Sequence, residues 1–187
     1  MCYLIRMGAD VNLCGGVYGN ALQAAAADPK HRPVEWMYLP KEFSKYPKVE
    51  ALLNPGASVN MVGGRYGTAL QAAALDGSDD VVKLLLSYGA DVDVEGGEYG
   101  SALKAAVCVG ARTSLESNTH PELSPEDCYR NGVRLLLDHG AKVDEDVMTA
   151  ARDSSDEHIL SMLQECFENS AVKEKDEICG MFGTLFD

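Results

Sequence analysis

The strongest constraint on this chain is a segment of 18 residues that occurs three times. Residues 8–25 read GADVNLCGGVYGNALQAA, residues 56–73 read GASVNMVGGRYGTALQAA, and residues 89–106 read GADVDVEGGEYGSALKAA. The second and third copies begin 33 residues apart, at Gly56 and Gly89. Repeats of this length are supersecondary units that bury their apolar faces by stacking on one another. The chain is therefore expected to be a stack of similar units.

Two intervals between the copies are longer than this period. Gly8 and Gly56 are 48 residues apart, and Gly89 and Gly140 are 51 residues apart. In both intervals the extra residues follow the ALxAA segment, so we interpret them as loops inserted at one point of the unit. A fourth, degenerate unit begins near Gly140 and lacks the GGxYG segment. The predicted repeat domain covers residues 1–169, and a C-terminal tail, 170–187, follows it. The domain consists of a half helix 1–8, repeats of about 9–56, 57–89 and 90–140, and a degenerate terminal repeat 141–169. The long inserts lie at residues 28–47 and 110–127.

Each unit is expected to contain two short helices. In the second copy, Thr68 stands before an apolar helical pattern and is a good N-cap, because its hydroxyl can accept a hydrogen bond from a free amide of the first turn. Asp79 and Asp80 are expected at the N-terminus of a second helix, where carboxylates interact favourably with the helix dipole. Gly89 is expected just after its C-terminus, where glycine readily adopts a left-handed conformation. The predicted class is all-α, a solenoid of stacked helix–turn–helix units with extended, glycine-rich turns.

These residues resemble the ankyrin repeat. The segment 68–74, TALQAAA, matches the family's T-P-L-H-x-A-A, and the segment 81–93 matches its second-helix signature. The resemblance covers roughly residues 1–166. The family's histidine ties neighbouring turns together by hydrogen bonds; Gln23 and Gln71 can do likewise, whereas Lys104 has no acceptor. The GGxYGxALxAA variant resembles repeats of large fungal proteins, which implies that the chain is a fragment or a short relative of such an array.

Charge and motifs exclude several classes of function. With 16 basic and 29 acidic residues the net charge is −13, which argues against binding to nucleic acid or an anionic membrane. Six cysteines without a C-x-x-C pair or a signal peptide indicate reduced thiols in an intracellular protein, cytoplasmic or nuclear. We find no phosphate-binding loop, zinc motif or nucleophile elbow. The sequence therefore predicts no enzyme, catalytic residue, metal site or cofactor.

The resemblance implies a scaffold that binds another protein, and the positions that differ between copies are the candidate contacts. The alternative is a passive structural or regulatory segment of a larger protein. Variation at these positions marks either specificity or a lack of constraint. The candidate residues lie at the turns and in the first helices, with one in the first insert: Leu13, Cys14, Val17, Met61, Val62, Arg65, Leu75, Asp76, Val94, Glu95, Glu98 and Trp36.

Aromatic residues admit two interpretations. Tyr18, Tyr66 and Tyr99 recur in register, and we expect them to fill gaps between adjacent turns. An aromatic binding ladder is the alternative, and it requires exposed rings. Trp36, in the first insert, is either an interface anchor or packed back onto the repeats.

Overall fold

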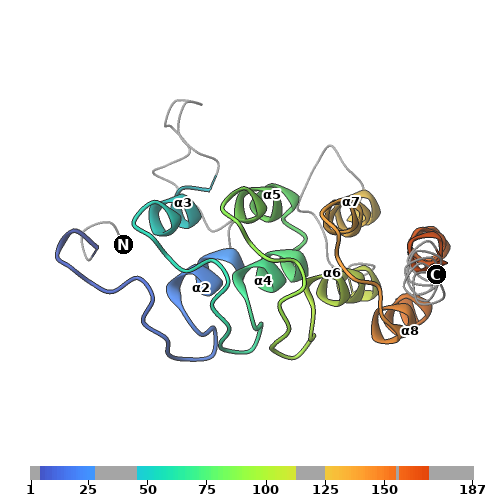
Figure 1. The fold of residues 1–187 in the computed structure, drawn as a ribbon, viewed down its shortest axis with the longest axis horizontal. Helices are drawn as coiled ribbons and strands as arrows, with labels where there is room; N and C mark the ends of the chain where they lie inside the picture. The colour runs from blue at the N-terminus through green and yellow to red at the C-terminus, as the bar shows by residue number, and fades with distance from the viewer. Residues whose placement is uncertain (1–4, 28–45, 113–124, 155, 169–187) are drawn as a thin grey trace, which may run out of the picture.

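The computed structural model describes residues 5–27, 46–112, 125–154 and 156–168. Its helices form two rows (Figure 1). The first row holds the first helix of each unit, and the second row holds the second helices, with the extended turns projecting beyond the first row. This arrangement confirms the predicted all-α solenoid. The first row is α2 (Ala21–Ala27), α4 (Ala69–Asp76), α6 (Ala102–Arg112) and α8 (Glu145–Ser154); the second is α3 (Pro47–Leu53), α5 (Asp79–Ser87) and α7 (Pro125–Asp138). A further helix covers residues 157–168.

The first helices of the three GGxYG repeats begin at side-chain caps, and Thr68 is the cap that the sequence predicted. Thr68 and Gln71 form a reciprocal capping box: the Gln71 amide donates to the Thr68 hydroxyl, and the Thr68 amide donates to the Gln71 side chain. Asn20 caps α2 with the same reciprocity toward Gln23. Ser101 accepts from the amide of Lys104, 3.2 Å away. Each cap satisfies backbone amides that the first turn leaves without a partner.

Small residues let the first helices approach closely. In α4 the residues from Ala69 to Ala74 are all buried, and the leucine at the second position of the helix, Leu70, is 1% exposed. The second helices supply larger side chains, such as Val81 and Leu85, to the same core. The core therefore runs along the stack between the two rows of helices.

The turns between units end in three hairpins, which we call the first, second and third tips (residues 13–19, 61–67 and 94–100). Each is closed by an isolated antiparallel bridge between its glycines, such as Gly63 with Gly67. Gly64 has a φ of +61°, and a Cβ there would lie 2.3 Å from the carbonyl carbon of Tyr18. Glycine is required at this position because the preceding tip leaves no room for a side chain.

Buried glutamines join each of the first two repeats to the next one. The side-chain amide of Gln23 donates to the carbonyls of Met61 (2.9 Å) and Gly67 (2.6 Å). Gln71 donates in the same way to Val94 and Gly100, both at 2.8 Å. The expectation that glutamine can replace the family's histidine is thus confirmed.

A second set of contacts runs between the starts of the turns. Asn12 accepts from the amide of Ser58 at 2.7 Å. Asn60 accepts from the amide of Asp91 at 2.8 Å and donates to the carbonyl of Gly89 at 3.1 Å. The successive turns are therefore fixed to one another at two places, the glutamine and the asparagine.

The junction with the terminal unit (residues 141–168) replaces these amides with charges. Lys104 pairs with Asp146 at 3.2 Å. Asp93, at the asparagine position, accepts from the amide of Lys142 at 3.0 Å and pairs with its ammonium at 3.6 Å. Lys104 has no acceptor atom, so it cannot replace the glutamine, and it forms an ion pair with the Asp146 carboxylate instead.

Within the terminal unit, Asp156 anchors the last helix. Its carboxylate accepts from Tyr129 and Arg130 of α7 and from the amides of His158 and Ile159. Burial works to raise the pKa of Asp156, but these hydrogen bonds outweigh it and hold the pKa at about 2.

The predicted inserts are only partly described. α6 continues to Arg112 and α7 begins at Pro125, so helix reaches into both ends of the insert 110–127. α3 begins at Pro47, the last residue of the insert 28–47. Trp36 and the predicted tail, 170–187, lie outside the described residues.

Candidate protein-binding surface

The three tips form one continuous row because their backbones are bonded to each other. The amide of Arg65 donates to the carbonyl of Val17 at 2.7 Å, and the amide of Glu98 donates to the carbonyl of Arg65 at 2.9 Å. Val17, Arg65 and Glu98 occupy the variable position of GGxYG in the three copies. The three hydrogen-bonded tips thus present an apolar, a cationic and an anionic side chain at equivalent positions.

The two charged members of this row bind each other. The Arg65 guanidinium pairs with the Glu98 carboxylate at 2.7 Å, and about half of each side chain stays exposed. The hydrogen bond to Glu98, followed by its negative charge, raises the pKa of Arg65. An exposed pair of this kind contributes little to stability. Its principal effect is to fix the direction of two charges that face solvent.

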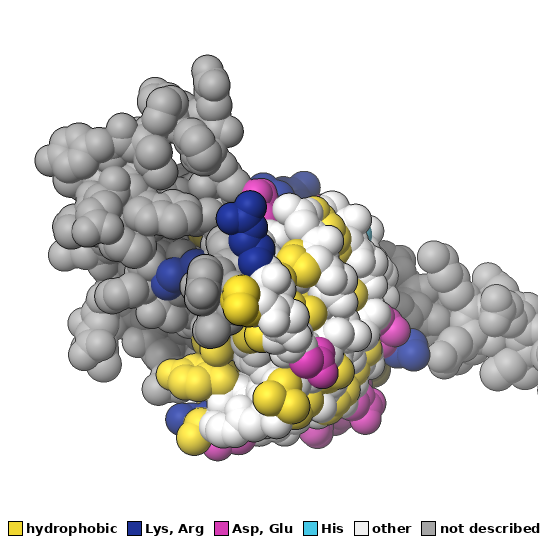
Figure 2. All heavy atoms as spheres, turned by 90° about the vertical axis from the view of Figure 1, so that its left-hand side faces the viewer, with side chains coloured by type: hydrophobic (Ala, Val, Ile, Leu, Met, Phe, Trp, Pro, Cys, Tyr) yellow, Lys and Arg dark blue, Asp and Glu magenta, His cyan; other side chains and the backbone are white. Residues whose placement is uncertain are grey.

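The first tip is apolar and exposed. Leu13 is 74% exposed, Val17 is 68% exposed and Tyr18 is 47% exposed. Val62 of the second tip is also exposed. Figure 2 views the molecule from this end and shows hydrophobic side chains on it, with basic and acidic side chains beside them. Exposed apolar groups that cluster in this way are typical of interaction surfaces.

Other predicted contact residues are involved in joining tips. The Cys14 thiol lies 3.2 Å from the Met61 sulfur and links the first tip to the second. The carbonyl of Val94 accepts from Gln71, while the Val94 side chain is half-buried. Glu95, beside it, is exposed. The tips therefore combine residues that face solvent with residues that hold the row together.

The first-helix candidates lie at the end of α4 and are less accessible. Leu75 is half-buried and packs against the core. Asp76 accepts a hydrogen bond from the hydroxyl of Ser78. The structure thus places these two apart from the tips, next to the start of α5.

The recurring tyrosines do not share one environment. Tyr66 and Tyr99 are half-buried and pack against the core, as a gap-filling role requires. Tyr18 is exposed, and its ring centroid lies 5.8 Å from that of Tyr66 in a tilted arrangement. Register in the sequence could not separate Tyr18 from the other two. What sets it apart, among the described residues, is that the second and third tips are bonded to a preceding tip and the first is not.

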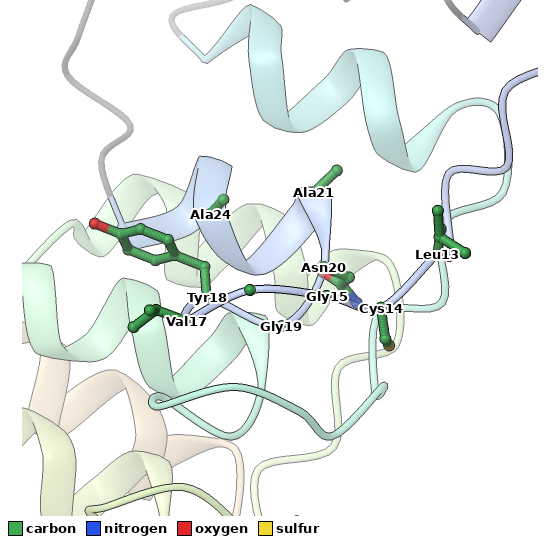
Figure 3. Close-up of a pocket in the computed structure, with 10 residues that line it drawn as sticks. Leu13, Cys14, Gly15, Val17, Tyr18, Gly19, Asn20, Ala21 and Ala24 are labelled. Carbon is green, nitrogen blue, oxygen red and sulfur yellow. The ribbon is translucent and has the colours of Figure 1, made fainter.

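A shallow hollow of about 400 Å³ lies beside the first tip. Leu13, Cys14 and Val17 of the predicted set line it, together with Tyr18 and two alanines of α2 (Figure 3). Its lining is mainly apolar and carries no charged side chain. Sequence reasoning did not identify this hollow.

The described part of the chain holds neither a membrane-spanning helix nor a cluster of metal ligands. No helix there is long and apolar enough to cross a membrane. No group of three His, Cys, Asp or Glu side chains there is arranged to hold a metal ion.

Comparison with known proteins supports one family. Residues 67–96 match the family model of the ankyrin repeat. The match runs from the end of the second tip, through α4 and α5, into the third tip. No curated protein matches the chain significantly.

Proposed function

Taking as premise that these units are ankyrin repeats, we propose that the chain is a non-catalytic scaffold that binds another protein through its tips and first helices. Ankyrin repeats generally mediate protein–protein interaction, and the family is typically non-catalytic. The observation that carries the proposal is the row formed by Val17, Arg65 and Glu98. Different side chains stand there on one hydrogen-bonded frame, which is how a repeat protein varies its specificity without changing its fold.

The proposed contact surface has two parts. The first is the apolar part, with Leu13, Val17 and Val62 exposed beside Cys14 and Met61. The second is the charged part, with Arg65 paired to Glu98 and with Glu95 exposed beside Val94. Leu75, Asp76 and Trp36 remain proposed contacts at the margin. Such a surface suits a partner with apolar groups at one end and mixed charge at the other.

The net charge of −13 supports a protein as the partner. A strongly acidic surface repels phosphate backbones and anionic lipid head groups, so we propose neither nucleic acid nor membrane as a ligand. We propose an intracellular site of action, because the six cysteines lack the spacing of a secreted disulfide framework.

The test uses a variant that alters the surface while keeping the ion pair. Exchanging the two charges, Arg65→Glu with Glu98→Arg, retains the pair and reverses both surface charges; Val62→Ser is added to alter the apolar part. Proteins captured from a cell lysate by the wild type and by the variant are compared by mass spectrometry. We expect at least one protein whose recovery falls tenfold or more.

The matched control is the same charge exchange in the exposed pair between Glu145 and Arg152 of α8. Both variants must melt at the temperature of the wild type. Equal recovery by the tip variant would contradict the proposed surface and direct attention to Trp36. Recovery of no specific protein by the wild type would favour the passive structural segment.

A further inference from the structure

Two sulfur atoms meet where the first tip lies against the second. The Cys14 thiol is 3.2 Å from the thioether sulfur of Met61, although the two residues are 47 positions apart in the sequence. Cys14 is exposed and lines the hollow beside the first tip (Figure 3), and Met61 is half-buried. Stacking of the repeats therefore produces a pair of sulfur donors that solvent can reach.

The sulfur pair occurs at only one of the two equivalent junctions between tips. In the register of the repeats, Cys14 corresponds to Val62 and Met61 corresponds to Val94. The second junction thus has two valines where the first has two sulfurs. Apolar side chains are sufficient for the stack at these positions, as the valines show. The sulfurs add what valine lacks, which is the capacity to bind a metal ion.

The backbone that carries the two donors is fixed by hydrogen bonds. The Gln23 side chain donates to the carbonyl of Met61 at 2.9 Å, and the amide of Arg65 donates to the carbonyl of Val17 at 2.7 Å. Gly63 leaves room beside the thiol, because an added Cβ there would lie 4.0 Å from the Cys14 sulfur. The two donors therefore belong to a preorganised frame.

The chemistry of the donors selects the metal. Thiolate and thioether are soft ligands, and they favour Cu(I) over hard cations. The described residues contain no group of three His, Cys, Asp or Glu ligands, whereas a zinc centre needs at least three protein ligands. Cu(I) is a closed-shell ion that accepts two ligands in a linear arrangement. Its complex with one thiolate has no net charge, which suits a hollow whose lining carries no charged side chain.

Binding requires the two sulfurs to move slightly apart. Bonds from a metal to a thiolate are about 2.3 Å long, so a linear ion holds its two sulfurs roughly 4.6 Å apart. The present distance is 3.2 Å. Cys14 is exposed and can change its rotamer, and the methionine side chain has three rotatable bonds. Side-chain rotations can therefore supply the difference.

We propose that Cys14 and Met61 form a two-sulfur site for Cu(I) at the junction of the first and second tips. On binding, the S–H bond of Cys14 breaks and its proton passes to water. The resulting thiolate and the Met61 thioether each donate an electron pair to the ion, and the oxidation state of copper does not change. The site goes beyond the proposed function and needs no partner protein.

The probe is Cu(I) held by a chromophoric chelator, added without oxygen to the whole reduced chain. Withdrawal of copper by the protein lowers the absorbance of the chelator complex, and the competition gives a dissociation constant. We expect Met61→Leu to weaken the tightest site by about tenfold or more, and Cys14→Ser to abolish it. Met7→Leu, at another exposed methionine, and Cys108→Ser, at another free cysteine, are the matched controls and should leave it unchanged.

A transplant tests whether the pair is sufficient on this frame. Val62→Cys with Val94→Met places the same two donors at the second junction, and we expect one additional tight site for Cu(I). All variants must melt at the temperature of the wild type. A folded transplant that gains no site would overturn the proposal.

Magnetic resonance of the methionine methyl groups tests the thioether directly. The chain has seven methionines, and the Met61 signal is the one that disappears in Met61→Leu. We expect this signal to shift when Cu(I) binds while the others stay in place. An unmoved Met61 signal, or unchanged affinity in Met61→Leu, would reduce the site to a lone thiol and overturn the proposal. These readouts involve no captured protein, so failure of the proposed function is recorded separately.

Discussion

The junctions between the three full repeats differ from the junction with the terminal unit, although all occupy the same places in the stack. At the first two, Gln23 and Gln71 donate from buried side chains to backbone carbonyls of the next turn. At the last, Lys104 reaches an exposed carboxylate, that of Asp146. A buried neutral amide is costly to remove because its partners are left without water, whereas an exposed ion pair contributes little. Equivalent positions therefore carry unequal shares of the stability.

The largest effect is expected at the second junction. Gln71→Ala removes two hydrogen bonds to the next tip and half of the capping box, and leaves polar groups unsatisfied. We expect a loss of about 3 kcal/mol in the free energy of unfolding, measured by urea denaturation. Lys104→Ala, the matched change at the last junction, should cost about 0.5 kcal/mol. Equal losses would refute the contrast between the junctions.

Acid should act on the terminal unit. The folded-state pKa of Asp156, about 2, lies below its ordinary value of 3.8, and its side chain is only 8% exposed. The stabilisation is therefore complete above the ordinary pKa and is lost as the pH falls toward 2. We expect the free energy of unfolding to fall by roughly 2 kcal/mol over this range. Amide hydrogen exchange in residues 157–168 measures this loss. Asp156→Asn should flatten this pH dependence; an unchanged profile would contradict the assignment.

A smaller effect is expected where an exposed amide joins two turns. Asn60→Ala removes the hydrogen bonds to the backbone of Gly89 and Asp91. We expect a loss of about 1 kcal/mol in the free energy of unfolding. Asp93→Ala, its counterpart at the last junction, should cost less in high salt than in low salt, and Asn60→Ala should not depend on salt. Equal salt dependence of the two losses would contradict this contrast and show that the two positions act alike.

The smallest effect sharpens the comparison at Lys104. Lys104→Gln introduces at this junction the glutamine side chain found at the other two. The terminal unit has no GGxYG tip whose carbonyls could accept hydrogen bonds from its amide. We expect a change below about 0.5 kcal/mol and a loss of salt dependence at this junction. A gain comparable to the cost of Gln71→Ala would mean that a backbone acceptor lies within reach after all.

Features shared by the copies could be predicted from the sequence, because periodicity reports what every unit does. The cap at Thr68, the glutamine bonds and the all-α stack follow from residues that recur in register. Features that depend on a neighbour could not. Nothing in the composition of the first tip separates Tyr18 from Tyr66; the difference lies in which neighbouring tip each ring contacts in the described structure. Likewise, two variable positions, Arg65 and Glu98, gave no sign of pairing until the tips were placed side by side.

The glutamine contacts also bear on how such a chain can change in evolution. Gln23 and Gln71 bind main-chain carbonyls of the next turn, and the tips bind each other through main-chain atoms. These hydrogen bonds between successive units therefore do not depend on which side chains the next unit exposes at its tip. A duplication of the coding sequence for one 33-residue period would insert a unit that fits both neighbours at once, without a compensating substitution in either. Mutations at the displayed positions could then accumulate without disturbing assembly.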